Sequence, residues 1–141
     1  MMMRLILGAA LFTLALLYLG TSYAVAETAP QTEIVPLGYD NLALEKTTLP
    51  FYAPSDNTLP WAYVRGEVGN PAADYPVIIQ IYDAHGSPVL FTQTAVDEDN
   101  RYEYQFRVRD VLQDGTVIKI FEGDYTVIVF KTVHQNDQTL V

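Results

Sequence analysis

The sequence predicts an all-β protein, built as an antiparallel β-sandwich of six to seven strands. Segments between residues 61 and 133 alternate apolar and polar side chains with a period of two, the pattern of strands with one buried and one solvated face. Turn-forming residues separate these segments about every ten residues, a spacing typical of sandwiches. Both observations favour short strands joined by short turns.

The clearest strands lie in the segment 77–109, which we interpret as a meander of one antiparallel sheet. In its last strand four apolar side chains alternate with charged or polar ones, so that one face is apolar and the other is charged. Val77, Ile79 and Ile81 form a similar apolar row, whereas the middle strand has apolar residues on both faces. The predicted strands are 77–82, 89–96 and 101–109, and the turns between them are 83–88 and 97–100.

Three further strands complete the expected sandwich. They are predicted at 61–68, 116–121 and 125–133, which gives six strands between residues 61 and 133. The strand spacing indicates a sandwich of immunoglobulin-like type over 61–133, although the sequence has no cysteine pair of the kind that marks antibody domains.

The N-terminal segment 1–26 predicts a secretory signal peptide. One basic residue, Arg4, precedes an apolar stretch, and Ala24-Val25-Ala26 offers a small-residue cleavage site. The alternative is an uncleaved membrane anchor, because the stretch from Leu5 to Ala26 is nearly long enough to span a bilayer. The chain is therefore expected to be extracellular or at the cell surface, exported by the secretory pathway.

Residues 27–60 predict a Pro-rich N-terminal arm, and residues 134–141 a frayed C-terminal tail. The arm is too apolar for a plain linker and supplies one edge strand at most. The last strand has apolar residues on both faces, so we expect the arm to pack beside that strand and cover its second apolar row. The alternative is that the arm adds as a strand to a neighbouring subunit.

Composition narrows the range of partners and chemistry. Once residues 1–26 are removed, 7 basic and 17 acidic side chains remain, so the net charge is −10. A chain this acidic repels phosphate backbones, which makes nucleic acid an unsuitable partner. The sequence contains no cysteine, which rules out disulfides, thiolate metal sites and cysteine nucleophiles.

A family resemblance is carried by two segments, Asn100-Arg101-Tyr102-Glu103-Tyr104-Gln105-Phe106 and Phe121-Glu122-Gly123-Asp124-Tyr125-Thr126-Val127, together with Tyr63-Val64-Arg65-Gly66-Glu67-Val68. They resemble paired motifs of carboxypeptidase-regulatory-like and related immunoglobulin-like domains, especially domains of archaeal secreted surface proteins. The resemblance covers about residues 62 to 133 and departs from the pattern at Asn100, where glycine is common. It implies an adhesive, spacing or accessory module.

Two polar turns are candidate chemical sites. Asp83, His85 and Ser87 have the residue types of a catalytic triad, but three neighbours on one turn do not converge easily, and turn formation explains them better. In the second turn, Asp97, Asp99 and Asn100 are candidate calcium ligands, with Asp74 or Asp124 as additional donors. The alternative is an ordinary solvated turn, and no other cofactor is expected.

Three aromatic residues are candidates for a binding surface. Trp61, Tyr63 and Tyr82 fall on strand faces that we expect to point outward, and such rings suit sugars or protein partners. The alternative, which the apolar residues of the arm favour, is that the arm covers them.

These observations predict an exported, non-catalytic immunoglobulin-like module that acts at the cell surface in adhesion, scaffolding or envelope assembly. Its expected partners are cell-surface or envelope proteins or other copies of itself, with carbohydrate as a further candidate and the membrane only through an uncleaved segment 1–26. One alternative is a subunit of an extracellular filament assembled by strand exchange. A small secreted hydrolase is the third hypothesis. It is disfavoured because the sequence has only two histidines and no recognisable nucleophile motif.

Overall fold

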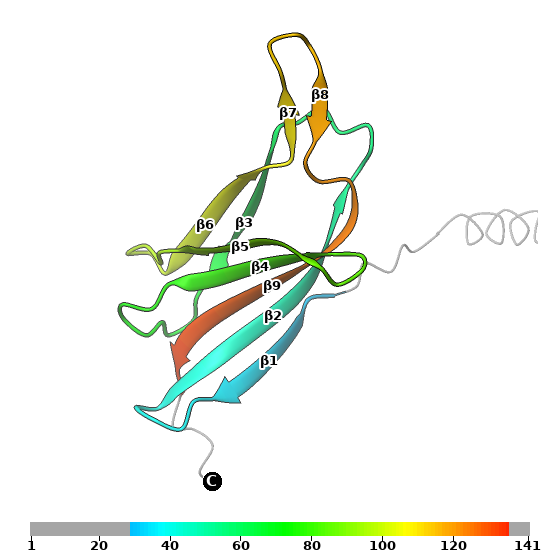
Figure 1. The fold of residues 1–141 in the computed structure, drawn as a ribbon. Coiled ribbons are helices and arrows are strands. Elements are labelled where there is room, and N and C mark those ends of the chain that lie inside the picture. The colour runs from blue at the N-terminus through cyan, green and yellow to red at the C-terminus, as the bar shows by residue number, and fades with distance from the viewer. Residues whose placement is uncertain (1–28, 136–141) are drawn as a thin grey trace, which may run out of the picture.

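The computed structural model describes residues 29–135, and every regular element in that range is a β-strand. The strands form antiparallel sheets of five, two and two strands, so the predicted all-β sandwich is confirmed (Figure 1). The strands are β1 (Gln31–Pro36), β2 (Leu42–Ala53), β3 (Trp61–Glu67), β4 (Val77–Asp83), β5 (Pro88–Thr94), β6 (Arg101–Arg107), β7 (Arg109–Val111), β8 (Val117–Lys119) and β9 (Gly123–His134).

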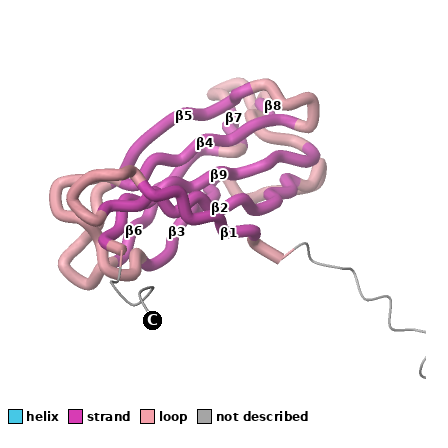
Figure 2. Tube along the Cα trace, turned by 90° about the horizontal axis from the view of Figure 1, so that it is seen from below, coloured by secondary structure: helices cyan, strands magenta, loops and turns pink. Residues whose placement is uncertain are grey.

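The five-stranded sheet, in the order β1-β2-β9-β4-β5, is the larger layer of the sandwich. Its centre is the pair β2 and β9, which run antiparallel over all twelve residues of each strand, from Leu42 opposite His134 to Ala53 opposite Gly123. The smaller layer is the pair β3 and β6, and Figure 2 shows it on one side of the five-stranded sheet.

The core lies between these two layers, and strict alternation fills it from both sides. Ile79 and Ile81 of β4 are fully buried, and so are Val127 and Val129 beside them on β9. From the smaller layer, Phe106 faces them with 5% of its surface exposed, while its neighbour Arg107 points to solvent. The apolar rows predicted for 77–82 and 101–109 are therefore the buried faces.

One end of the core is closed by four aromatic rings. Phe51, Phe106, Phe121 and Tyr125 meet with ring centroids 5.0 to 6.0 Å apart, mostly edge to face. Edge-to-face pairs add to the energy of apolar burial, because the positive edge of one ring meets the negative face of another. The four rings come from β2, β6, β9 and the segment just before β9, so they tie the two layers together at this end.

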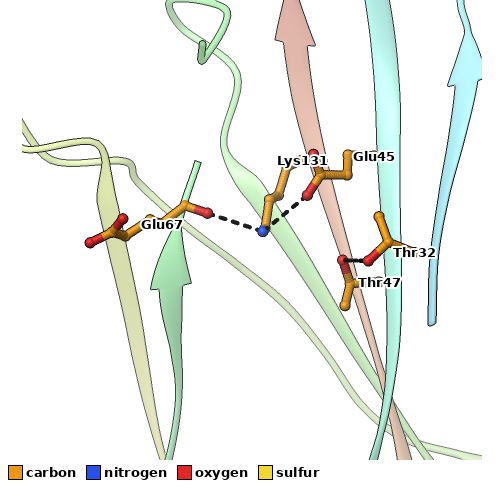
Figure 3. Close-up of polar contacts among 5 residues, drawn as sticks. All are labelled: Thr32, Glu45, Thr47, Glu67 and Lys131. Carbon is orange, nitrogen blue, oxygen red and sulfur yellow. Dashed lines mark hydrogen bonds and ion pairs between the residues drawn. The ribbon is translucent and has the colours of Figure 1, made fainter. Parts of the chain in front are cut away.

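A partly buried ion pair closes one flank of the sandwich (Figure 3). Lys131 of β9 donates to a carboxylate oxygen of Glu45 at 3.2 Å and to the backbone oxygen of Glu67 at 3.0 Å. Its ammonium nitrogen also lies 5.5 Å from the ring centroid of Tyr102. The pair thus links β2 and β9 to the end of β3, where the smaller layer stops.

The predicted single meander over 77–109 is wrong in one respect. β4 and β5 do pair, but β6 leaves their sheet and pairs with β3 in the other layer. Between β5 and β6 the structure has one side-chain hydrogen bond, from Thr94 Oγ1 to the backbone oxygen of Glu103 at 3.1 Å. The physical reason is the core, since the apolar rows of β4 and β6 bury each other only when the strands face one another across two layers.

The prediction for the arm was partly right. Residues 31–53 form two strands, and β2 lies beside β9 within the same chain, as expected. It joins the sheet edge to edge, however, and so lies beside the second apolar row of β9 instead of covering it. The prolines are compatible with these strands: Pro36 ends the edge strand β1, and Pro50 lies beyond the part of β2 that β1 pairs with, where a missing N–H costs no ladder bond.

Strand number also differs from the prediction, with nine strands among residues 29–135 against six to seven expected. Two come from the arm, and the strand predicted at 101–109 divides at Val108. There the backbone N–H of Val108 donates to Pro60 O at 2.8 Å, and Val108 O accepts from Ile120 and Phe121. This switch of partners bends the chain into the β7–β8 hairpin, which projects beyond the sandwich (Figure 1).

The predicted signal peptide, residues 1–26, lies outside the described residues, and so does the tail from Asn136 onward. The first two residues of the predicted tail 134–141 are described and are bonded to the fold: the N–H of His134 donates to Asn70 O at 2.9 Å and that of Gln135 to Asn41 O at 2.7 Å. Within residues 29–135 no helix is long and apolar enough to cross a membrane.

Candidate binding surfaces

The outward face of the β3–β6 layer carries two of the three predicted aromatic residues. Trp61 is 40% exposed and Tyr63 is 52% exposed, so the idea that the arm covers them is wrong. They lie two residues apart on β3 and therefore point to the same side of the sheet. The two rings lie at the end of the layer that adjoins the β7–β8 hairpin.

Each ring is held by the residue opposite it on β6. The guanidinium carbon of Arg107 lies 4.6 Å from the centroid of the Trp61 ring, and Gln105 Nε2 donates to the Tyr63 hydroxyl oxygen at 3.2 Å. Arg107 is fixed in turn by Asp110, with Nη1 and Oδ1 2.6 Å apart. Each ring of the aromatic row therefore has a contact within the chain that holds it in place.

The rest of this outward face is charged and balanced in sign. Arg65 lies opposite Glu103, and Arg101 Nε lies 3.5 Å from Glu67 Oε1. With Arg107 and Asp110, the face has three cations and three anions. A flat surface of this kind presents rings and hydrogen-bonding groups without a net charge of its own.

Tyr82, the third predicted residue, lies on the opposite side of the molecule. It is half-buried on the outward face of the five-stranded sheet, where its hydroxyl donates to Gln80 Oε1 at 2.8 Å. It also lines a cavity of about 390 Å³ together with Asp83, Asp124 and Ile128. The three aromatic residues therefore do not form one site.

The turn of Asp83, His85 and Ser87 is built by a single carboxylate. Asp83 Oδ1 accepts hydrogen bonds from the backbone N–H groups of His85 and Ser87, both at 2.9 Å. Gly86 has φ of 79°, which closes the turn. The aspartate thus engages the backbone, and the exposed side chains of His85 and Ser87 are not its partners. The turn interpretation accounts for all three residues.

The calcium candidates repeat that turn. Asp97 Oδ1 accepts from the backbone N–H groups of Asp99 and Arg101, both at 2.9 Å, and Asn100 takes the positive φ of 61° that glycine takes in the other turn. Asp74 shares a cavity of about 480 Å³ with Asp97 and Asn100. Within residues 29–135 no three acidic or histidine side chains are grouped to hold a metal ion. Calcium binding stays a prediction.

A larger surface, which the sequence did not predict as a binding surface, is the outward face of the five-stranded sheet. Ile78 lies opposite Phe130, and Ile128 lies beside Gln80 in the next row. Phe91, opposite Gln80 on the other side, is 71% exposed. The signal was present in the sequence, as strands with apolar residues on both faces, but was interpreted as a surface that the arm would cover. The apolar members of this face are Val35, Leu44, Tyr52, Ile78, Tyr82, Phe91, Ile128 and Phe130.

The β7–β8 hairpin is a second exposed apolar region. Five large aliphatic side chains on or beside it are each more than two-fifths exposed: Val111, Leu112, Val117, Ile118 and Ile120. At its tip Thr116 N donates to Asp114 Oδ1 at 2.9 Å, and hydrogen bonding from Thr116 lowers the pKa of Asp114. The tip therefore keeps a charged carboxylate.

Comparison with known proteins returned no matching family model, no matching curated protein and no matching solved structure. The resemblance to immunoglobulin-like and carboxypeptidase-regulatory-like domains stays a prediction from the motifs, while the antiparallel all-β sandwich itself is shown.

Proposed function

We propose that this chain is an exported, non-catalytic module of immunoglobulin-like type, which binds a cell-surface or envelope partner through the outward face of β3 and β6. The observation that carries the proposal is the exposed pair Trp61 and Tyr63, each fixed by a residue of β6. Adhesion, scaffolding and envelope assembly all need such a ready-made contact surface.

The chemistry of the face suits a flat partner. Tryptophan and tyrosine offer large rings with a polar group, so they contact both apolar and hydrogen-bonding surfaces. Because Arg107 and Gln105 already hold the rings, binding costs little side-chain entropy. Protein surfaces and the ring faces of sugars both fit this description, whereas nucleic acid is disfavoured by the acidity of the chain.

Co-sedimentation with envelopes prepared from the source cells tests the proposal. We expect the exported protein to sediment with envelopes, and the double variant Trp61→Ala/Tyr63→Ala to stay in the supernatant. Tyr52→Ala is the matched control, because Tyr52 is 62% exposed on the opposite outward face. Equal sedimentation of the double variant and the unaltered protein would contradict the proposed face.

The edge of the five-stranded sheet favours a second candidate, a filament subunit assembled by strand addition. All six residues of β1 are exposed, and its outer edge is unpaired among the described strands. Electron microscopy of the concentrated protein should then show filaments, and Ile34→Lys should abolish them because an edge lysine blocks strand addition. Filaments that persist in this variant would exclude the β1 edge.

A further inference from the structure

We propose that the outward face of the five-stranded sheet is a self-association surface, against which a second copy of this chain packs face to face. This inference is independent of the partner-binding face on β3 and β6, which lies on the other side of the sandwich. It rests on the apolarity of the face, its lack of cover, its charge and its size.

The apolar residues cluster on neighbouring strands, with polar residues between some of them. Phe130 stands between Ile78 of β4 and Lys46 of β2, and Ile128 stands in the next row between Gln80 and Thr48. The patch continues to Phe91 at one edge of the sheet. Because a strand needs only one apolar row to fold in a sandwich, this second row is available for association.

Nothing within residues 29–135 covers the patch. The β3–β6 layer packs on the inward face of the five-stranded sheet, and the β7–β8 hairpin projects beyond the sandwich. The long strands β2 and β9 run about 40 Å at the rise of an extended chain.

Charge favours a second copy as the occupant. The charged side chains at outward positions of the five strands are Lys46, Glu33 and Asp124, and the first two form an ion pair at 3.7 Å. This face therefore has a net charge of −1, whereas the predicted export product has −10. Two copies that meet here bring little charge together and keep their acidic loops and turns apart, so electrostatic repulsion across this interface is weak.

The size of the face fits a stable dimer. Five strands spaced about 4.8 Å apart, two of them twelve residues long, give a flat footprint of about 700 Å². A standard interface buries about 800 Å² from each partner. Two sheets that pack face to face interdigitate their side chains at about 10 Å separation, and a two-fold axis sets the same apolar rows against each other.

Analytical ultracentrifugation of the exported protein, with its N-terminus identified by mass spectrometry, tests the inference. We expect a closed dimer that tightens as salt rises, because salt screens the repulsion between the acidic bodies. The variant Phe91→Gln/Ile128→Thr removes two apolar side chains from each copy, so its dissociation constant should rise about 100-fold or more. Trp61→Ala and Ile118→Gln are the controls on the other outward face and on the hairpin, and both should leave the dimer intact.

Crosslinking locates the interface directly, because the sequence has no cysteine. A short bis-maleimide should link copies of Thr48→Cys, which lies beside Ile128, and should leave Gln105→Cys on the opposite face unlinked. A monomer at every concentration would overturn the inference. So would an open ladder of oligomers, a dimer that only the Ile118 or Trp61 variant dissociates, or a link formed only through residue 105.

Discussion

The two outward faces of the sandwich follow opposite rules. On β6, every outward residue from Arg101 to Arg107 is charged or an amide, and each has a partner across the strand pair on β3. On β9, outward positions carry Ile128 and Phe130, and Phe91 of β5 extends the same apolar surface. The inward faces are alike, since both layers bury aliphatic and aromatic rows.

The contrast shows that burial within a fold and apolarity of a strand are separate properties. One apolar row per strand is enough to build this core, and β6 has no more than that. The second row of β9 is not needed for the sandwich to close, because the layer of β3 and β6 lies on the other side. This second apolar row is therefore the feature of the sequence that indicates association with another molecule.

The largest effect is expected in the layer of β3 and β6, where β6 has one apolar row and one solvated row. Phe106→Ala should lower the free energy of unfolding by about 3–5 kcal/mol, because it leaves a cavity in the aromatic cluster. Arg107→Ala should cost less than about 1 kcal/mol, the value of an exposed cation–π contact. Urea denaturation of both variants checks this. Equal losses would mean that the faces of β6 are assigned the wrong way round.

The next test compares two isoleucines that are neighbours on β4. Ile79 is fully buried, so Ile79→Ala should cost about 2–5 kcal/mol of unfolding free energy. Ile78 lies half-buried on the outward face, and Ile78→Ala should cost about 1 kcal/mol or less when measured at dilutions where copies do not associate. A similar cost for both would show that the outward row is needed by the fold itself.

A smaller effect is expected where the inward row of β3 has no side chain. A Cβ at Gly66 would lie 2.7 Å from the hydroxyl oxygen of Tyr102, its partner across the strands. Gly66→Ala should therefore lower Tm and cost about 1–3 kcal/mol through overpacking. Gly69→Ala is the control, because nothing lies within 4 Å of its Cβ position. Adding Tyr102→Phe, which removes the clashing atom, should recover part of the loss.

The smallest effect concerns pH and the same tyrosine. Burial, and secondarily the charge of Glu45, raises the pKa of Tyr102 above its usual value. A group whose pKa is higher in the folded state stabilises the protein below the unfolded pKa, here about 10, and that contribution is lost as pH rises through the folded pKa. Urea unfolding from about pH 8 to 11 should show a fall in stability that is shallower in Tyr102→Phe. An identical fall in both proteins would exclude Tyr102 as the cause.

Local patterns in the sequence predicted the individual strands better than they predicted which strands pair with one another. Alternation in 77–82 and 101–109 gave the buried faces correctly, because the pleat fixes side-chain direction within a strand. Pairing depends on partners far away in the chain, so the shift of β6 to β3 was not visible. Pro50 hid β2 for a similar reason: whether a proline is tolerated depends on which neighbour the strand lacks at that point.

The candidate sites divide in the same way. The turn chemistry of Asp83 and Gly86 was predictable from residue type alone, and the outward direction of Trp61 and Tyr63 followed from alternation. The separation of Tyr82 from them depends on which layer each strand joins, which no local pattern reveals. The cross-strand partners Arg107 and Gln105 required the register of β3 and β6.

The pairing of β2 with β9 also determines when this chain becomes a folded protein. The centre of the larger sheet joins residues 42–53 to residues 123–134, so that sheet is incomplete until residue 134 has left the ribosome. Contacts between residues so far apart in sequence form slowly, because the entropy of closing a long loop is lost before any contact stabilises the structure. Until β9 is synthesised, the larger sheet therefore lacks the strand that joins β2 to β4.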